Sequence, residues 1–299
     1  MMQIGVDFGG TKIEAAALDA DGGFLARLRE PNPGTYDAAL ATVVRLVERI
    51  ERDLGRSGSV GLAVPGSVSP TTGRMRNANS TWLNDRSFGE DLEAALGRPV
   101  RLANDANCLA LSEAVDGAAS GAAVVFAVII GTGCGGGLVV NGQLIPGANR
   151  LAGEWGHVAL PWPTAEEMPG PACWCGLHGC LETWISGTGF QRDHTAMTGQ
   201  VLGAEAITAA AGADDRDATA SMDRYTDRLA RALAMVINLV DPDVVVMGGG
   251  LSNIADLYPR VTAAVARHAF ADSLVTRIVP ARWGDSSGVR GAARLWPVD

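Results

Sequence analysis

Three of the five cysteines in this chain lie within one stretch of eight residues, Cys173 to Cys180, and one of only four histidines precedes it by 16 positions. Thiolate sulfur and imidazole nitrogen are typical ligands of tetrahedral Zn²⁺, and a closed set of three cysteines and one histidine forms a structural site. The alternative is a reduced, metal-free loop. The spacing favours structural zinc, and the predicted ligands are His157, Cys173, Cys175 and Cys180.

Two carboxylates, Glu154 and Glu182, are interleaved with these ligands, although zinc does not require them. A metal loop that also fixes two acidic side chains indicates a polar pocket held in shape by the ion. The proline-rich stretch 160–171, which leads into the cysteines, is expected to be a surface loop.

Three glycine turns follow apolar segments of the chain, at Gly9-Gly10-Thr11, Gly131-Thr132-Gly133 and Gly248-Gly249-Gly250. Without side chains, such turns let backbone N–H groups approach phosphate oxygens closely. Ordinary hairpin turns also use glycine, so one turn alone would be weak support. None of the three turns matches a Walker-type phosphate loop. The segment 131–136 loosely matches the glycine pattern of a dinucleotide-binding motif, but it is followed by a predicted strand, whereas that motif is followed by a helix. Three such turns in one chain favour phosphate binding.

The segment from Asn104 to Asn107 lies where a predicted strand meets a predicted helix. Asn and Asp are favoured helix caps, which is the structural interpretation of this segment. The functional interpretation is that Asp105 projects from the start of the helix as a general base. Phosphoryl transfer needs one group that accepts the hydroxyl proton and donors that hold the phosphates in line.

The elements that would position these residues alternate between strands and helices. Strands are predicted over 3–8, 13–18, 100–102, 124–130 and 243–247, and helices over 38–54, 106–115, 222–239, 251–270 and 288–296. A strand, a glycine turn, a second strand and a hairpin turn occur twice, about 120 residues apart. This pattern predicts an α/β fold with mixed sheets and a duplicated domain that has one glycine loop on each side of a cleft. The predicted lobes are a small one over 1–118, completed by a C-terminal helix over 288–299, and a large one over 119–287 with the zinc site.

Composition excludes several classes of protein. The 299 residues are 47% apolar and 19% charged, as in ordinary globular proteins. The net charge of −9 weighs against nucleic acid as a partner, because phosphate contacts need clustered Lys and Arg. No apolar run is long enough for a membrane span, and the first residues lack the pattern of a signal peptide. We therefore expect a cytoplasmic protein, in a reducing compartment where cysteines bind metal more often than they form disulfides.

Taken together, five segments resemble the ROK family of sugar kinases, which belongs to the actin/hexokinase ATPase superfamily. They are Asp7 to Lys12, Asn104 to Asn107, Gly131 to Gly135, Glu154 to His157 and Cys173 to Glu182. The resemblance extends from Gln3 to Trp296 and implies a two-lobed, duplicated fold of mixed sheets flanked by helices, with a zinc-binding loop. The family also includes transcriptional repressors with a helix-turn-helix ahead of the first strand, and here that strand is expected to start at residue 3.

The resemblance also implies residue roles. Asp105 is expected to take the proton of the sugar hydroxyl, and the sugar is expected to contact Gly66, Asn79, Asn104, Glu154, His157 and Glu182. Phosphates, Mg²⁺ and adenosine of ATP are expected at Asp7, Gly9, Gly10, Thr11, Lys12, Gly131, Thr132, Gly133, Gly248, Gly249 and Gly250. The two ring nitrogens of His157 would allow it to bind zinc and a sugar hydroxyl at once.

The segment Asn79 to Asn84 most resembles the bacterial fructokinase/mannokinase branch of the family. Fructose or mannose is therefore the expected substrate, with N-acetylglucosamine or glucose as alternatives, phosphorylated at the 6-hydroxyl. The alternative from another class is a sugar-sensing regulator without catalysis. The resemblance favours a homodimer. ATP is the expected donor, and polyphosphate, which some relatives use, is left open as a further donor.

Overall fold

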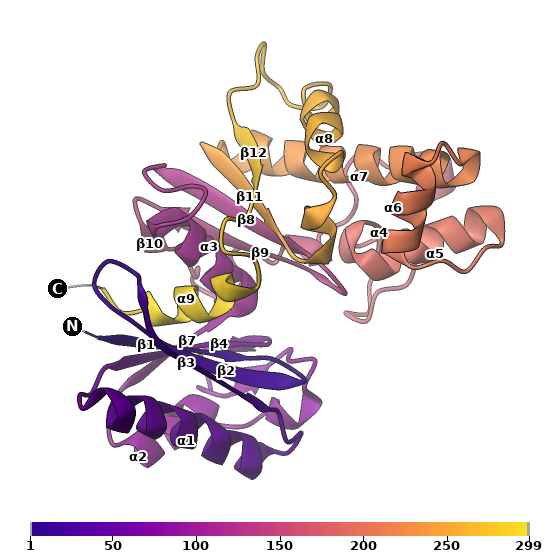
Figure 1. The fold of residues 1–299 in the computed structure, drawn as a ribbon. Helices are drawn as coiled ribbons and strands as arrows, with labels where there is room; N and C mark the ends of the chain where they lie inside the picture. Colours follow the sequence, from indigo (N-terminus) through magenta and orange to yellow (C-terminus); the bar gives the residue numbers. More distant parts are fainter. Residues whose placement is uncertain (1, 298–299) are drawn as a thin grey trace. The chain divides into compact units, whose positions relative to one another are not determined.

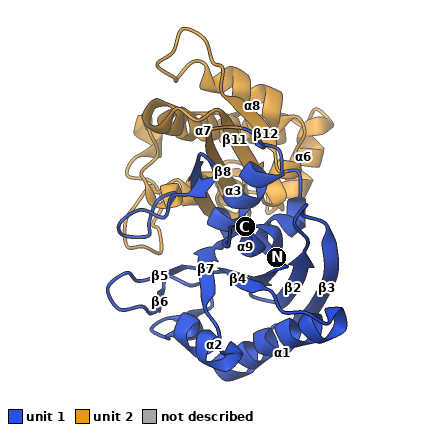
Figure 2. Ribbon diagram, turned by 90° about the vertical axis from the view of Figure 1, so that its left-hand side faces the viewer, with its two compact units in different colours: residues 1–121, 137–153, 282–299 blue, residues 122–136, 154–281 orange. Residues whose placement is uncertain are grey.

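The computed structural model describes residues 2–297, and these form two compact units (Figures 1 and 2). Unit 1 contains residues up to 121 together with 137–153 and 282–297, and unit 2 contains 122–136 and 154–281. The predicted α/β fold with mixed sheets is confirmed, because each of the two main sheets has five strands and combines parallel with antiparallel pairs.

Unit 1 is built on a sheet with the strand order β3-β2-β1-β4-β7. Its strands are β1 (Gln3–Phe8), β2 (Lys12–Leu18), β3 (Phe24–Pro31), β4 (Ser59–Val64) and β7 (Val100–Asn104). Strands β1, β2 and β3 pair antiparallel, whereas β4 pairs in parallel with both β1 and β7. The carboxyl ends of β1, β4 and β7 therefore lie at one edge of the sheet, where Asp7 and Asn104 are found.

Helices cover both faces of this sheet (Figure 1). One face packs on α1 (Tyr36–Leu54) and α2 (Phe88–Leu96), because α1 carries a buried stripe that includes Val43, Leu46 and Ile50. The other face meets α9 (Ser287–Ala293), whose backbone lies so close to the strands that a Cβ on Gly5 would be 1.9 Å from the Val289 carbonyl oxygen. Helix α3 (Asp105–Val115) follows β7 and packs on α9.

The smaller elements of unit 1 form its loops. They are β5 (Ser67–Val68), β6 (Met75–Arg76), η1 (Thr81–Leu83), β10 (Gln143–Leu144) and η5 (Gly284–Ser286).

The second five-stranded sheet has the order β10-β9-β8-β11-β12. Strands β8 (Val124–Ile130), β11 (Val244–Gly248) and β12 (Arg277–Pro280) lie in unit 2, and β9 (Cys134–Val140) passes from unit 2 to unit 1 after Gly136. Strand β11 pairs in parallel with both β8 and β12 and is buried over its whole length, as its unbroken apolar sequence requires.

The helices of unit 2 are α4 (Glu182–Ile185), α5 (Gly187–Thr198), α6 (Ala204–Gly212), α7 (Arg216–Val240) and α8 (Leu257–Val265), with short 3₁₀ turns η2 (Trp155–His157), η3 (Ala165–Glu167) and η4 (Gly250–Asn253). Helix α7 is the longest and packs on α5, α6 and α8. It also holds the 160–171 stretch, since the buried Glu167 accepts hydrogen bonds from Arg228 and Arg231, each at 2.8 Å. The predicted surface loop is confirmed, because most residues of 160–171 are exposed and only Leu160 and Glu167 are buried.

Most predicted elements are confirmed within a few residues of their expected ends. The single helix expected over 251–270 was wrong, because η4, a turn and α8 occupy this range. Pro259 explains the difference: proline is tolerated in the first turn of a helix, so α8 begins at Leu257. The C-terminal helix expected over 288–299 is observed as Ser287–Ala293, and residues 298 and 299 lie outside the described range.

The compact units also differ from the predicted lobes. The segment 137–153, expected in the large lobe, belongs to unit 1. The physical reason is close packing on α3: a Cβ on Gly137 would lie 2.7 Å from the Ala106 carbonyl oxygen.

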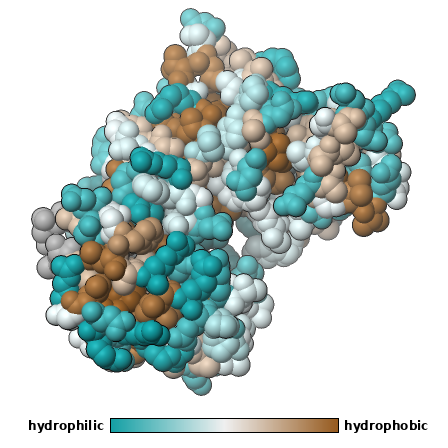
Figure 3. All heavy atoms as spheres, in the orientation of Figure 1, coloured by the Kyte–Doolittle hydropathy of each residue, from teal (hydrophilic) through white to brown (hydrophobic). Residues whose placement is uncertain are grey.

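Apolar and polar side chains are interspersed on the face of the molecule that Figure 3 shows. None of the helices between residues 2 and 297 combines the length and the apolar character that a membrane span requires.

Candidate functional site

The predicted zinc ligands are brought together in unit 2. The ligand atoms of His157, Cys173, Cys175 and Cys180 all lie within 4.8 Å of one another. The Sγ atoms of Cys175 and Cys180 are 3.6 Å apart, close to the ~3.8 Å expected for two thiolates bound to one tetrahedral Zn²⁺. Cys173 Sγ lies 3.5 Å from His157 Nδ1, so this nitrogen faces the cluster. The donor set and its spacing therefore fit a zinc ion.

Local structure explains why these four residues converge. His157 ends the turn η2, and Cys180 is held by a β-bridge to Ala159. Gly176 and Gly179 have φ angles of +91° and +70°, which glycine adopts without strain. Burial raises the pKa of the Cys180 thiol to about 12, so metal binding here would release protons.

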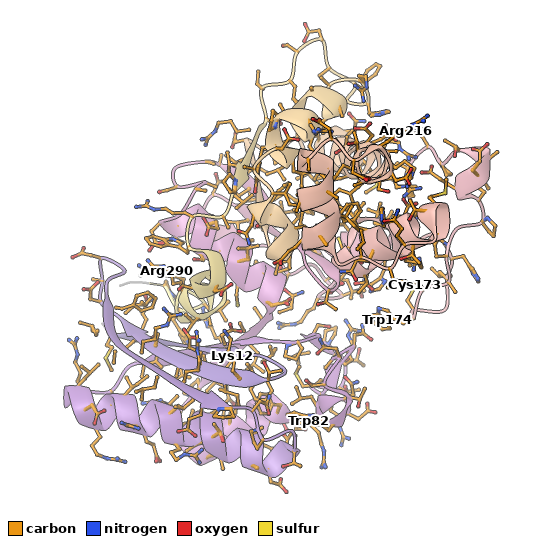
Figure 4. All side chains as sticks on the ribbon, turned by 45° about the vertical axis from the view of Figure 1, so that its right-hand side comes forward. Lys12, Trp82, Cys173, Trp174, Arg216 and Arg290 are labelled. Carbon is orange, nitrogen blue, oxygen red and sulfur yellow. The ribbon has the colours of Figure 1, made fainter. Side chains whose placement is uncertain are left out.

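Glu182 begins α4 beside this loop, and a different loop holds each of its carboxylate oxygens. Trp174 Nε1 donates to Oε1 at 2.7 Å, and the backbone N–H of Cys134 donates to Oε2 at 3.0 Å. Gly133 leaves the space that this arrangement needs, since a Cβ there would lie 2.8 Å from Oε2. Glu182 thus links the metal loop to the second glycine turn. Figure 4 labels Cys173 and Trp174 on that loop.

The second glycine turn, between β8 and β9, rests on the start of α5. The backbone N–H of Gly187 donates to the Gly131 carbonyl at 2.6 Å, and Thr188 Oγ1 donates to the Thr132 carbonyl at 3.0 Å. These contacts fix the backbone of the turn against α5, and a phosphate-binding turn requires such a fixed backbone.

A cavity of about 1010 Å³ opens next to this turn. Three predicted ATP contacts line it, Gly131, Thr132 and Gly250, together with residues of α5, α6 and the segment after η4. Gly248 and Gly249 do not line it. Gly249 has φ +85° and packs on β8, since a Cβ there would lie 2.6 Å from the Ile130 carbonyl oxygen. The cavity is large enough for a nucleotide.

The first glycine turn, between β1 and β2 in unit 1, is held by a residue that sequence analysis missed. Asn32 Nδ2 donates to the Gly9 carbonyl at 2.7 Å, and the Asn32 N–H donates to the Thr11 carbonyl at 2.9 Å. Gly10 has open space where a Cβ would stand. The signal available in the sequence was Asn32-Pro33, a turn-forming pair at the end of a strand.

Asn104 and Asp105 differ in their local roles. Asn104 caps α3, because its Oδ1 accepts the N–H of Asn107 at 2.7 Å. Asp105 accepts the adjacent N–H of Ala106 at 2.8 Å. Loss of hydration raises the pKa of Asp105 and the Ala106 N–H lowers it; the side chain keeps exposed surface, which limits the size of the shift.

Asp7, the residue before the last one of β1, is close enough to Asp105 for their charges to interact. The pKa of Asp7 is raised to about 6, first by burial and then by the charges of Asp105 and Glu14, while the charges of Lys12 and Arg29 lower it. Neighbouring carboxylates that repel one another provide a favourable environment for a divalent cation, whose preferred ligands are oxygens. Lys12 extends from the same turn (Figure 4).

The remaining predicted sugar contacts are placed by backbone geometry. Gly66 has φ +74° and lies against the segment before Asn79, since a Cβ there would be 2.7 Å from the Ala78 nitrogen. Asn84 fixes that segment by accepting the Ala78 N–H at 2.9 Å and donating to the Ala78 carbonyl at 3.1 Å. Glu154 directly precedes η2, whose Trp155 is buried and donates to the Gly135 carbonyl at 2.9 Å.

Each unit therefore assembles its own group of predicted site residues. Unit 1 brings together Asp7, the first glycine turn and Asp105. Unit 2 brings together the metal cluster, Glu182 and the second glycine turn. The roles assigned to these residues stay predictions.

Comparisons with known proteins agree with these features along nearly the whole chain. A family model described as "ROK family" matches residues 3–298. An N-acetyl-D-glucosamine kinase of Escherichia coli O127:H6 is 41% identical over 303 residues, which cover 100% of both chains. The N-acetylgalactosamine kinase AgaK of Shewanella sp. (strain ANA-3) is 39% identical over 297 residues, with 98% of this chain and 96% of that protein covered. The crystal structure of a ROK hexokinase from Thermus thermophilus superimposes with a TM-score of 0.88 at 32% identity, and covers 98% of this chain and 97% of that one.

Proposed function

The chain belongs to the ROK family, and we propose that it transfers the γ-phosphoryl group of ATP to the 6-hydroxyl of an N-acetylhexosamine, with N-acetylglucosamine as the preferred substrate. The observation that carries the proposal is Asp105, which unit 1 presents at the start of α3 with few internal partners and beside Asp7. A carboxylate in this position has the properties of a general base for a sugar hydroxyl.

In the proposed reaction Asp105 accepts the hydroxyl proton while the sugar oxygen forms a bond to the γ-phosphorus. The bond between that phosphorus and the oxygen bridging to the β-phosphate breaks, and ADP leaves. Raising the pKa of a carboxylate makes it a stronger base, provided that it is ionised at the working pH. Loss of hydration would have this effect on Asp105, and a cation bound at Asp7 would keep Asp105 ionised.

The nucleotide is proposed to bind through residues of all three glycine turns. Its adenosine end would occupy the cavity beside Gly131, Thr132 and Gly250 in unit 2. Its phosphates, with Mg²⁺, would be held by Asp7 and by the turn from Gly9 to Lys12. Mg²⁺ enters as part of the substrate complex and neutralises charge on the phosphates when bound.

The sugar is proposed to bind through polar groups that can each pair with a hydroxyl. Glu154, His157 and Glu182 would serve in unit 2, and Gly66, Asn79 and Asn104 in unit 1. Sugar hydroxyls both donate and accept, so carboxylates, amides and an imidazole can satisfy all of them. The metal cluster, with Zn²⁺ bound, would hold His157 and the loop beside Glu182 in place.

The names of the relatives support one of the candidate sugars over the others. Sequence analysis favoured fructose or mannose and kept N-acetylglucosamine as an alternative. Proteins 41% and 39% identical to this chain are an N-acetyl-D-glucosamine kinase and an N-acetylgalactosamine kinase, and they support the alternative. We therefore rank N-acetylglucosamine first, N-acetylgalactosamine second, and fructose and mannose after them. A homodimer is part of the same proposal, and light scattering on the purified protein measures it.

The test is a coupled ADP-release assay with each of these sugars and glucose, for wild-type protein and for Asp105→Asn. We expect the highest kcat/KM with N-acetylglucosamine and at least about a 10²-fold loss of kcat in the variant. Higher kcat/KM with fructose or mannose would restore the first expectation. Sugar binding without any ADP release would instead identify a sugar-sensing protein.

A further inference from the structure

Trp174 has an unusual combination of exposure and fixed contacts. It stands between two of the predicted metal ligands, Cys173 and Cys175, and 67% of its surface is exposed. Its ring meets His157 edge-on, with centroids 4.8 Å apart and planes at 87°. Its N–H donates to Glu182 Oε1 at 2.7 Å. The side chain thus contacts two residues of the proposed sugar site without being buried in a core.

The hydrogen bond to Glu182 has a geometric consequence for the carboxylate. One oxygen is fixed by Trp174 and the other by the Cys134 N–H at 3.0 Å, so the carboxylate plane cannot rotate freely. An ionised carboxylate has about four acceptor positions, of which these two bonds use two. One acceptor position on each oxygen is left, which is the arrangement that two adjacent sugar hydroxyls require.

We propose that Trp174 is a positioning residue for sugar binding: it acts through Glu182, holding the carboxylate in the orientation that accepts hydroxyl groups of the sugar. The identity of the ligand rests on the proposed function. The residue touches Glu182 and His157, and the proposal requires no contact between its indole and the sugar. Because it lies inside the metal loop, it also connects the order of that loop to the orientation of Glu182.

The first test compares Trp174→Phe with wild-type protein. Phenylalanine keeps an aromatic ring beside His157 but removes the N–H that reaches Glu182. Calorimetric titration with N-acetylglucosamine, without nucleotide, should show a roughly 5- to 20-fold weaker Kd, as expected when a hydrogen bond to a charged group is lost at a partly exposed site. In the ADP-release assay KM for the sugar should rise by a similar factor, whereas kcat and KM for ATP should change less than about twofold.

A matched control is available in the same unit. Trp162 is also exposed, at 55%, and its ring stacks on His268 at 5.9 Å, away from Glu182. Trp162→Phe should leave the sugar Kd unchanged. The zinc content of both variants, measured by atomic absorption, should equal that of the wild-type protein, which separates the loss of one N–H from collapse of the metal loop.

The second test shows whether Trp174 acts through Glu182. In a Glu182→Gln background the acceptor is no longer charged, so adding Trp174→Phe should weaken sugar binding by a clearly smaller factor than it does in the wild-type background. Equal factors in both backgrounds would show independent action and overturn the inference. An unchanged Kd for Trp174→Phe alone would also overturn it.

These outcomes are distinct from those for the proposed function. If wild-type protein binds the sugar without releasing ADP, the kinase proposal fails, and the titrations still decide the role of Trp174. If wild-type protein phosphorylates N-acetylglucosamine and Trp174→Phe binds it equally well, the function stands and the inference fails. If wild-type protein binds none of the five sugars, both fail.

Discussion

Asp7 is predicted to lower the stability of the protein at neutral pH, and Asp7→Asn should therefore be a stabilising substitution. The carboxylate is partly buried at the end of β1, near Asp105 and Glu14, and packed against the start of α9, where a Cβ on Gly288 would lie 3.0 Å from Oδ2. Its charged form is poorly hydrated and is repelled by like charges. Asparagine keeps the shape of the side chain and cannot acquire the charge.

The size and sign of the effect follow from the pKa. Folding raises the pKa of Asp7 from 3.8 to about 6, so the folded state binds a proton more tightly than the unfolded state does. Stability therefore falls as the pH rises through this interval. The cost of ionised Asp7 is about 1.6 kcal/mol at pH 5 and about 3 kcal/mol at pH 8, and these are upper limits because solvent screens a partly exposed group.

Urea unfolding followed by circular dichroism measures this prediction, at pH 5 and pH 8 and without Mg²⁺ or ATP, since a bound cation would relieve the repulsion. Asp7→Asn should exceed the wild-type protein in unfolding free energy at pH 8 by about 1–3 kcal/mol, and by roughly half as much at pH 5. Asp21→Asn, in an exposed turn of the same unit, is the control and should differ little at either pH. A difference independent of pH, or a less stable Asp7→Asn at pH 8, would refute the reasoning.

Two further predictions concern the metal cluster and a buried carboxylate of unit 1. Removal of zinc by a chelator should lower the Tm and weaken N-acetylglucosamine binding measured by calorimetry, because His157 is proposed to bind both the metal and the sugar. A folded, metal-free protein with unchanged sugar affinity would contradict the coupling. Glu113 is fully buried and accepts hydrogen bonds from three backbone N–H groups and the Ser287 hydroxyl at 2.8–3.1 Å. Glu113→Gln turns an N–H₂ group toward these donors, so it should lower the free energy of unfolding in urea by about 2–3 kcal/mol. The control is Glu48→Gln at an exposed position, which should change the free energy of unfolding little.

The ligand set of the metal cluster could be predicted because its information is local. Cysteine and histidine have few competing uses at such spacing, and the glycines between them permit only a compact turn. The four predicted residues are the four whose ligand atoms lie within 4.8 Å of one another in the structure. Short continuous apolar runs likewise predicted β8 and β11, since such a run between turn residues is most often a buried strand.

Residues that act by supporting others left weaker signals. Asn32 holds the first glycine turn, and Asn84 holds the segment before Asn79, yet each is a polar residue in a loop, where asparagine is common. Trp174 was one tryptophan among seven, and most tryptophans pack in cores. Its hydrogen bond to Glu182 depends on how the metal loop folds back on α4, which no local pattern specifies.

The third glycine turn shows most clearly why a site cannot be taken directly from a motif. Gly248, Gly249 and Gly250 are identical in type and adjacent in sequence, yet only Gly250 lines the cavity, whereas Gly249 is required because the turn passes close to the backbone of β8. Close packing, a positive φ angle and ligand access can each require glycine, so the sequence alone does not tell which of them applies at a given position.

Gly249→Ala and Gly250→Ala distinguish these requirements. The first should lower the free energy of unfolding by about 1–3 kcal/mol, through strain at φ +85°, and the second, with open space at its Cβ position, should leave stability nearly unchanged and raise KM for ATP. Equal losses of stability in the two variants would show that the whole run serves packing.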